Sequence, residues 1–283
     1  MLSLALTVPL ATTASSDPLI PIVGSDVVGL SVEVVGNNLV TGIGTNRTIR
    51  LVATVPTGWR LDAVAGNLDT PLTVQAVDGT FYQHAFGGNT SLDINDGLIP
   101  IFPELAYDSW TTIGAYNQSG EPYSEPNAVN TLGIDWSTFD TQHFISSTNG
   151  TWYVTPEDIQ GTTAPFVGPC DRIRDGVAIA QLTLVGDNAS LSFSALLQGK
   201  DNLNQPWQRH IDSIVIGTDN TSPVDVMQGC DFDLTDDDTI NVTDLLELLT
   251  NWSDPCMDFD FDSDTGASDL VLLLAQWGPC PTS

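Results

Sequence analysis

The sequence predicts a mainly β protein, a loop-rich β-sandwich that is followed by a small α-helical module. Between about residues 20 and 218, short segments alternate apolar and polar residues and are separated by Gly, Asn, Asp and Pro. From about residue 230 onward, apolar residues recur instead with the spacing of short amphipathic helices. The predicted parts are an N-terminal segment (1–16), the sandwich domain (20–218), a linker (219–229) and the C-terminal module (230–283).

The first residues carry the features of an export signal. Leu2 to Ala11 form a short apolar run, and the small residues Thr12, Ala14 and Ser15 that follow resemble a cleavage region. We expect a signal peptide here, and the alternative is a first strand or a disordered tail. No other apolar stretch reaches the length of about 18 residues that a membrane-spanning helix needs. The sequence therefore predicts a secreted or cell-surface protein without membrane insertion.

The strands of the large domain are predicted from alternation and from turn residues. The run 176–185 and the run 190–197 are separated by Gly186, Asp187 and Asn188, which predicts a β-hairpin. Residues 85–165 are rich in Gly, Asn and Pro, and we expect loops with only short strands there. The remaining strands are predicted at 28–35, 48–55 and 210–216.

Charge is strongly unbalanced along the chain. There are 36 Asp and Glu residues against 7 Lys and Arg, which gives a net charge of −29. This charge repels nucleic acids and anionic membranes, and we expect neither as a partner. No basic residue follows Arg209, so the C-terminal module has only acidic charge. Such a segment either stays unfolded or folds around cations, and its leucine-rich stretches favour folding.

The C-terminal module contains a repeat of 25 residues. The stretch 244–252 aligns with 269–277, and apolar residues in both recur at i, i+3, i+4 and i+7. A cluster of aspartates precedes each stretch. We predict two short amphipathic helices, each preceded by an acidic loop.

Each acidic loop carries oxygen-bearing residues at alternating places. Calcium binds six to eight oxygens at about 2.3–2.6 Å, and a twelve-residue loop with this spacing wraps them around one ion. The last acid of each loop starts the helix, so metal binding is coupled to folding. We therefore predict calcium as the cofactor, with Asp233, Thr235, Asp237, Thr239, Asn241 and Asp244 as candidate ligands in the first loop, and Asp258, Asp260, Asp262, Asp264 and Asp269 in the second.

The two repeats resemble a type I dockerin module. The resemblance rests on the paired loop–helix units, on an Asp that closes each loop, and on the stretches TINVTDLLELL (239–249) and GASDLVLLL (266–274). It covers about 50 residues, roughly a fifth of the chain. It implies one calcium ion per repeat and docking of the paired helices onto a cohesin-like domain.

The sequence departs from that family's pattern at several positions. The glycine usual at the sixth place of each loop is Asp238 or Ser263, and the helices carry no basic residue. The ends NWSDPC (251–256) and QWGPC (276–280) are similar to dockerin-like tails of exported proteins from marine and planctomycete-type bacteria. The partner is therefore a cohesin-like protein, another cell-surface protein or a second copy of the chain.

Four cysteines, an even number, fit an exported protein with two disulfides. Three pairings are open. If the two loop–helix units are related by a twofold axis, the end of the second helix lies near the start of the first loop. This favours the hypothesis of a Cys230–Cys280 bond, with Cys170 and Cys256 forming the other.

The large domain contains no motif specific for catalysis. Glu104 and Asp108 lie near Trp110, and two carboxylates beside aromatic residues are what a glycosidase needs. Acidic residues are so frequent that a chance pairing is the alternative. The histidines His84, His143 and His210 are scattered without the spacing of metal ligands, and His210 is expected at a surface or edge. The aromatic residues are expected mainly in the core or as loop anchors, with a sugar-stacking platform as the alternative: Trp59, Tyr82, Tyr107, Trp110, Trp136, Trp152, Tyr153 and Trp207.

Two hypotheses about function follow from these patterns. In the first, the protein is a secreted, non-catalytic binding or structural protein, and its calcium-binding tail mediates attachment or assembly. In the second, it is a secreted carbohydrate-active enzyme that carries the same tail. A polysaccharide is a candidate partner in both.

Overall fold

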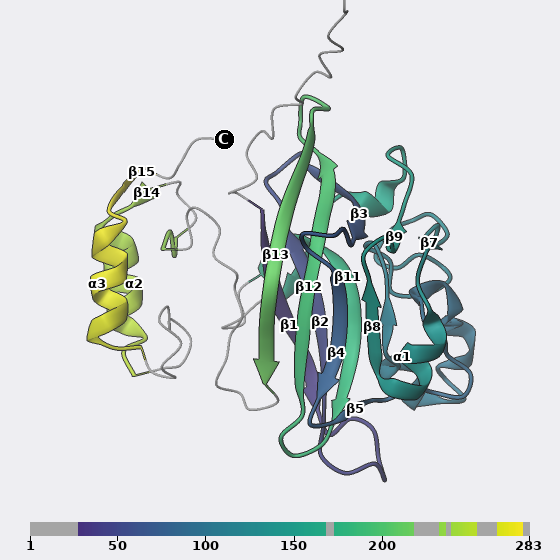
Figure 1. Ribbon diagram of the computed structural model, residues 1–283. Helices are drawn as coiled ribbons and strands as arrows, with labels where there is room; N and C mark the ends of the chain where they lie inside the picture. The colour runs from purple at the N-terminus through teal and green to yellow at the C-terminus, as the bar shows by residue number, and fades with distance from the viewer. Residues whose placement is uncertain (1–27, 168–172, 218–231, 236–238, 254–264, 280–283) are drawn as a thin grey trace, which may run out of the picture.

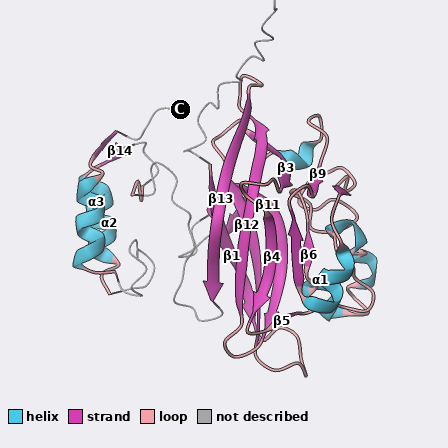
Figure 2. Ribbon diagram, viewed as in Figure 1, coloured by secondary structure: helices cyan, strands magenta, loops and turns pink. Residues whose placement is uncertain are grey.

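The computed structural model describes residues 28–167, 173–217, 232–235, 239–253 and 265–279. Long antiparallel strands dominate this structure, and helices are short (Figures 1 and 2). The prediction of a mainly β fold is confirmed. The strands predicted at 28–35, 48–55, 176–185, 190–197 and 210–216 all form, and each extends beyond its predicted bounds at one end or both.

The first sheet is built around two long neighbouring strands. β11 pairs with β2, and β2 pairs with β1, all antiparallel. On its other side β11 pairs with three short strands. The strands of this sheet are β1 (Gly29–Asn37), β2 (Asn46–Thr54), β11 (Ile173–Val185), β10 (Ala164–Val167), β5 (Thr80–Phe81) and β6 (Trp110–Thr111).

The second sheet is organised by β12. The hairpin predicted for 176–185 and 190–197 is wrong, because the chain crosses at the turn 186–188 from the first sheet to the second, and β12 pairs with β13, β3 and β4 instead of β11. β13 lies along one side of β12, while β3 and β4 pair end to end along its other side. The order across the sheet is β7–β9–β3–β12–β4–β8. The bounds are β7 (Asn130–Leu132), β9 (Thr151–Tyr153), β3 (Arg60–Ala65), β12 (Ser190–Lys200), β4 (Leu72–Val77), β8 (Phe144–Ser147) and β13 (Pro206–Gly217).

The hydrophobic core lies between these two sheets. One continuous cluster joins Ile49 and Leu51 of β2 to Leu61 of β3 and Phe193 of β12, and all four side chains are fully buried. Because successive residues of a strand point to opposite faces, alternation of apolar residues places one face of each sheet in this core. Burial of this apolar surface is the main contribution to the stability of the domain.

The outer face of the first sheet is also covered. Gln181 of β11 donates from its side-chain amide to the carbonyls of Ala106 and Asp108 and accepts from Arg50 Nε at 3.1 Å. Arg50 also pairs with Glu33 at 2.9 Å. The loop-rich segment that includes Ala106 and Asp108 therefore forms an outer layer on this sheet, held by buried polar contacts. It contains the 3-10 helices η2 (Ser91–Asp93), η3 (Asp96–Leu98) and η4 (Pro103–Tyr107), and a further one, η5 (Ile159–Gly161), follows β9.

The loop-rich middle also contains a helix that the sequence pattern did not predict. α1 (Trp136–Gln142) begins after Asp135, whose side chain accepts the Ser137 N–H, and ends at His143 in the left-handed region. Its Phe139 is fully buried in the main core. Trp136 packs against the same core, and these tertiary contacts stabilise a helix too short to form alone.

The C-terminal residues form two helices of equal length that pack on their own small core. They are α2 (Val242–Thr250) and α3 (Ala267–Ala275), each starting and ending two residues before the predicted position. Leu248 and Leu273 are fully buried, and Phe232, Leu234 and Ile240 are buried beside them. The short strands β14 (Thr239–Ile240) and β15 (Gly278–Pro279) pair beside them.

Candidate functional sites

The two C-terminal repeats make equivalent contacts. Ser253, after α2, donates its N–H to the carbonyl of Thr265 at 2.9 Å. Gly278, after α3, lies opposite Ile240 in the pairing of β14 with β15. Ser253 and Gly278 are 25 residues apart, as are Ile240 and Thr265, so the end of each helix contacts the eighth place of the other loop. The repeat seen in the sequence is thus a pseudo-twofold repeat in space.

Asp244 closes the first loop from the start of α2. Its Oδ1 accepts the N–H groups of Leu234 and Thr235 at 2.7 and 3.0 Å and the Thr235 hydroxyl at 3.0 Å. Its Oδ2 accepts the N–H of Asn241 at 2.7 Å, and Asn241 in turn caps the helix through the Thr243 N–H. The carboxylate therefore ties the twelfth place of the loop to its second, third and ninth places.

Asp269 occupies the matching position in α3. Its Oδ2 accepts the N–H of Gly266 at 2.7 Å, as Asp244 does from Asn241. Both carboxylates are fully buried. A buried carboxylate needs hydrogen-bond donors or a cation, and the sequence has no Lys or Arg after Arg209. An all-oxygen set of carboxylate, hydroxyl, amide and carbonyl groups is the chemistry that calcium prefers, so the residues of these loops fit this ion.

Part of each predicted loop lies outside the described residues. Asp233, Thr235, Thr239, Asn241, Asp244 and Asp269 are described, and no group of three or more His, Cys, Asp or Glu side chains within the described ranges is arranged to hold a metal. The predicted ligands Asp237, Asp258, Asp260, Asp262 and Asp264 are outside those ranges. So are Cys170, Cys230, Cys256 and Cys280, and their pairing stays a prediction.

Each C-terminal helix exposes a matched set of large apolar residues. Leu246, Leu249 and Trp252 of the first repeat are exposed, and their partners 25 residues later are exposed as well. Among the apolar residues of the two described helices, Leu248 and Leu273 alone are fully buried. The predicted amphipathic stripe is therefore only partly used by the module's own core. The second set is Val271, Leu274 and Trp277.

In the large domain, Glu104 and Asp108 are in different environments. Asp108 is fully buried, and its carboxylate oxygens accept the N–H groups of His84 at 2.6 Å and Gly88 at 3.1 Å. Burial raises the pKa of Asp108 to about 7, although these N–H donors lower it. Gly87 lies so close that a side chain there would overlap the carboxylate. Asp108 thus fixes the turn 84–88 from inside.

Glu104 is at the surface, in a hollow of about 470 Å³ lined also by Thr41, His84, Phe102 and Tyr107. Its Oε1 accepts the Thr41 N–H at 3.0 Å and the Thr41 hydroxyl at 2.7 Å, and these bonds lower the pKa of the carboxyl. Asp108 does not line this hollow. Glu104 and His84 line the same hollow, which the sequence did not indicate. Asp108 is not accessible to a substrate from this hollow.

The other residues singled out in the sequence have mainly structural environments. His210 lies exposed on β13, as expected, and shares a hydrogen bond of 2.5 Å with Thr70. His143 ends α1, and burial lowers its pKa. Four tryptophans are core residues, whereas Tyr82, Tyr107, Trp136 and Tyr153 are half-buried. The buried tryptophans are Trp59, Trp110, Trp152 and Trp207.

Comparison with protein-family models, with curated proteins and with solved structures finds no match to this chain. Within the part of the chain that the structure describes, no helix has the length and apolar character needed to cross a membrane.

Proposed function

We propose that the C-terminal module, residues 230–283, binds two calcium ions and attaches a secreted, non-catalytic binding or structural protein to a partner. The observation that carries this proposal is the pair of buried carboxylates, Asp244 and Asp269, in equivalent positions of a module without basic residues. Calcium supplies the positive charge that each loop lacks. The dockerin-like spacing of the loops supports the same proposal.

Coupling of metal binding to folding follows from how Asp244 is held. Its oxygens reach the loop start and the helix start at once, so any ion that the loop binds stabilises both. The module's own core is a small cluster, which supplies little hydrophobic stabilisation by itself. We therefore propose that calcium is required for the two helices to pack.

The exposed apolar residues of the two helices are the proposed attachment surface. An apolar set exposed on each of two related helices is costly in water unless a partner covers it. The partner is a cohesin-like or other cell-surface protein, or a second copy of the chain. The buried position of Asp108 does not support its use with Glu104 as a glycosidase pair, because that chemistry requires both carboxyls to reach the substrate.

Calorimetric titration of calcium into EDTA-treated protein tests this function. Wild type is expected to show two binding events, and Asp244→Asn and Asp269→Asn are each expected to lose one of them. Glu247→Gln is the matched control, because it removes the same charge from α2 but lies outside the predicted ligand positions. Absence of any binding at millimolar calcium would refute the proposal.

A further inference from the structure

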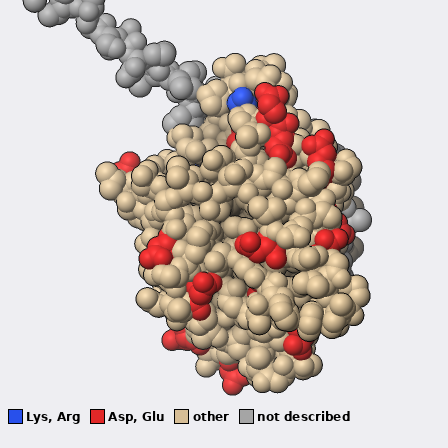
Figure 3. All heavy atoms as spheres, turned by 90° about the vertical axis from the view of Figure 1, so that its right-hand side faces the viewer, with Lys and Arg blue, Asp and Glu red and all other residues tan. Residues whose placement is uncertain are grey.

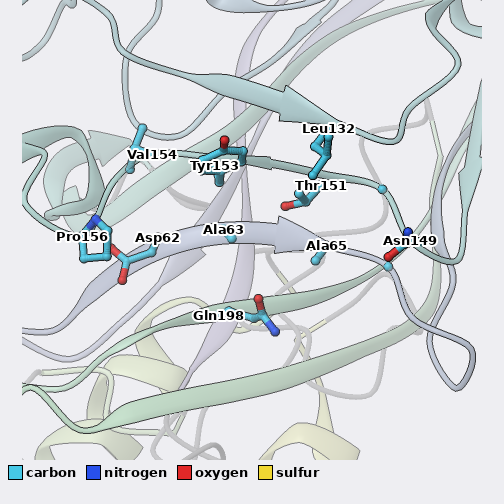
Figure 4. Close-up of a pocket in the computed structure, with 12 residues that line it drawn as sticks. Asp62, Ala63, Ala65, Leu132, Asn149, Thr151, Tyr153, Val154, Pro156 and Gln198 are labelled. Atoms are coloured by element: carbon cyan, nitrogen blue, oxygen red, sulfur yellow. The ribbon is translucent and has the colours of Figure 1, made fainter.

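The outer face of the second sheet carries a trough that the sequence did not reveal. It has a volume of about 390 Å³ and lies across β7, β9, β3 and β12 (Figure 4). Its floor consists of small residues, Ala63 and Ala65 of β3, with Gly66 and Gly150 at one end. The N–H of Gly66 donates to the carbonyl of Gly150 at 2.9 Å, which holds that end closed.

Strand register explains why a trough forms here. Ala63 lies opposite Tyr153 of β9 on one side and Gln198 of β12 on the other. The three residues form one row across the sheet, with a small side chain between two large ones. Neighbouring strands are about 4.8 Å apart, so Tyr153 and Gln198 are separated by roughly 10 Å at the backbone. This width accommodates one pyranose ring.

The polar groups around the trough are free to bind a ligand. The side-chain amides of Gln198 and Asn149 and the hydroxyl of Tyr153 make no hydrogen bond to any residue that the structure describes. Asp62, at the other end of β3 from Ala65, pairs with Arg60 at 2.5 Å through one oxygen only. Figure 4 shows Asp62 and Asn149 at opposite ends of the trough, with Tyr153 between them.

We propose that this trough binds an uncharged polysaccharide chain. Amide and hydroxyl groups match the donors and acceptors of sugar hydroxyls, and the Tyr153 ring together with Leu132, which is 66% exposed, provides an apolar wall for the C–H faces. Asp62 is already paired with Arg60, so the lining is close to neutral. An anionic chain is excluded by the net charge of −29, and the face in Figure 3 shows acidic side chains spread over the surface with few basic ones.

The trough is open to solvent, which suits an internal part of a chain rather than a small molecule that needs enclosure. From Asp62 to Ala65 the strand covers about 10 Å, comparable to the length of a disaccharide. This site is independent of the calcium-binding tail. Its test is therefore run both with calcium and with EDTA.

The test is native gel electrophoresis of the full chain through gels that contain one polysaccharide each: hydroxyethylcellulose, arabinoxylan, galactomannan or polygalacturonate. Retardation by at least one neutral polysaccharide, with and without calcium, and none by polygalacturonate is expected. Tyr153→Ala should weaken binding roughly tenfold and Gln198→Ala about threefold, from loss of the apolar contact and of a hydrogen bond. Ala63→Trp fills the trough without removing a polar group and should abolish retardation.

The matched controls are Tyr107→Ala, in the hollow beside Glu104, and Gln142→Ala, at the end of α1. Both should be retarded like wild type. The melting temperature of each variant is compared with that of wild type to establish that it is folded. If one variant fails to fold, the remaining variants of the series test the proposal. Unchanged retardation of folded Ala63→Trp, or no retardation by any neutral polysaccharide, would overturn the proposal. Equal retardation by polygalacturonate would overturn it as well.

Discussion

Asp108 in the sheet domain and Asp244 in the C-terminal module are both fully buried carboxylates held by backbone N–H groups. They differ in the structure that surrounds them. Asp108 belongs to the outer layer that covers the first sheet of a domain with an extensive core, whereas Asp244 belongs to a module with a small apolar cluster. The large core of the sheet domain stabilises it enough to offset the cost of burying one carboxyl, whereas the small module needs an additional source of stability. Asp108 therefore has a structural role, and we propose a metal-linked role for Asp244.

The largest expected effect is that of calcium removal on the C-terminal module. EDTA should abolish the packing of α2 and α3 and leave the sheet domain folded, because only the module lacks basic residues to offset its carboxylates. One site at a free calcium concentration 100 times its Kd stabilises by about 2.7 kcal/mol. Far-ultraviolet circular dichroism should show loss of helix, and limited proteolysis should then cut within α2 and α3. The same helix content and cleavage pattern with and without EDTA would erase the distinction between the two regions.

A smaller effect is expected from substitution of Asp108. Asp108→Ala leaves the N–H groups of His84 and Gly88 without their acceptor, and we expect a loss of about 3 kcal/mol in the free energy of unfolding. Urea denaturation of the calcium-loaded protein measures this loss, which should be the same in EDTA. A loss that depends on calcium would mean that the two regions are coupled.

The raised pKa of Asp108 also predicts a pH dependence. With a pKa of about 7 in the folded state and the ordinary value of 3.8 in the unfolded state, the folded protein binds the proton more tightly. The contribution of this group therefore makes stability fall as pH rises from about 4 to about 7, and level off above. Asp108→Asn should flatten this slope in urea denaturation, and Asp140→Asn, an exposed acid on α1, should not. An unchanged slope in Asp108→Asn would contradict the assignment.

The smallest effect on stability is expected from the exposed tryptophans of the module. Trp252→Ser and Trp277→Ser should each change the free energy of unfolding by less than about 0.5 kcal/mol, because neither side chain is buried. Sedimentation of the calcium-loaded protein at increasing concentration measures self-association. If the partner is a second copy, the double variant should be less associated than wild type. A large loss of stability would instead place these residues in the module's own fold.

The sequence predicts the parts of the molecule that depend on local periodicity. The long strands and the two C-terminal helices follow from alternation and from helical spacing, and their bounds differ by a few residues. The contacts between distant segments could not be predicted. Glu104 is held by Thr41, 63 positions earlier in the chain, and the burial of Asp108 depends on the fold of the turn 84–88.

The trough illustrates the same limit. Ala63, Tyr153 and Gln198 become neighbours only through the register of three strands that are far apart in the sequence. Each strand shows outward-facing residues of ordinary type, and none is unusual by itself. A signal was nevertheless present, since two alanines on the outward face of one strand leave space that larger neighbours enclose.

The distribution of tryptophans gives the molecule a built-in optical reporter. Of the five in the sheet domain, four are buried and Trp136 is half-buried, while Trp252 and Trp277, at 43% and 47% exposure, lie at matching positions after the two C-terminal helices. A neutral quencher such as acrylamide therefore reaches the emission of these two far more readily than that of the four. Fluorescence quenching of the unmodified protein can follow binding at its C-terminal end while the four buried tryptophans supply a constant reference.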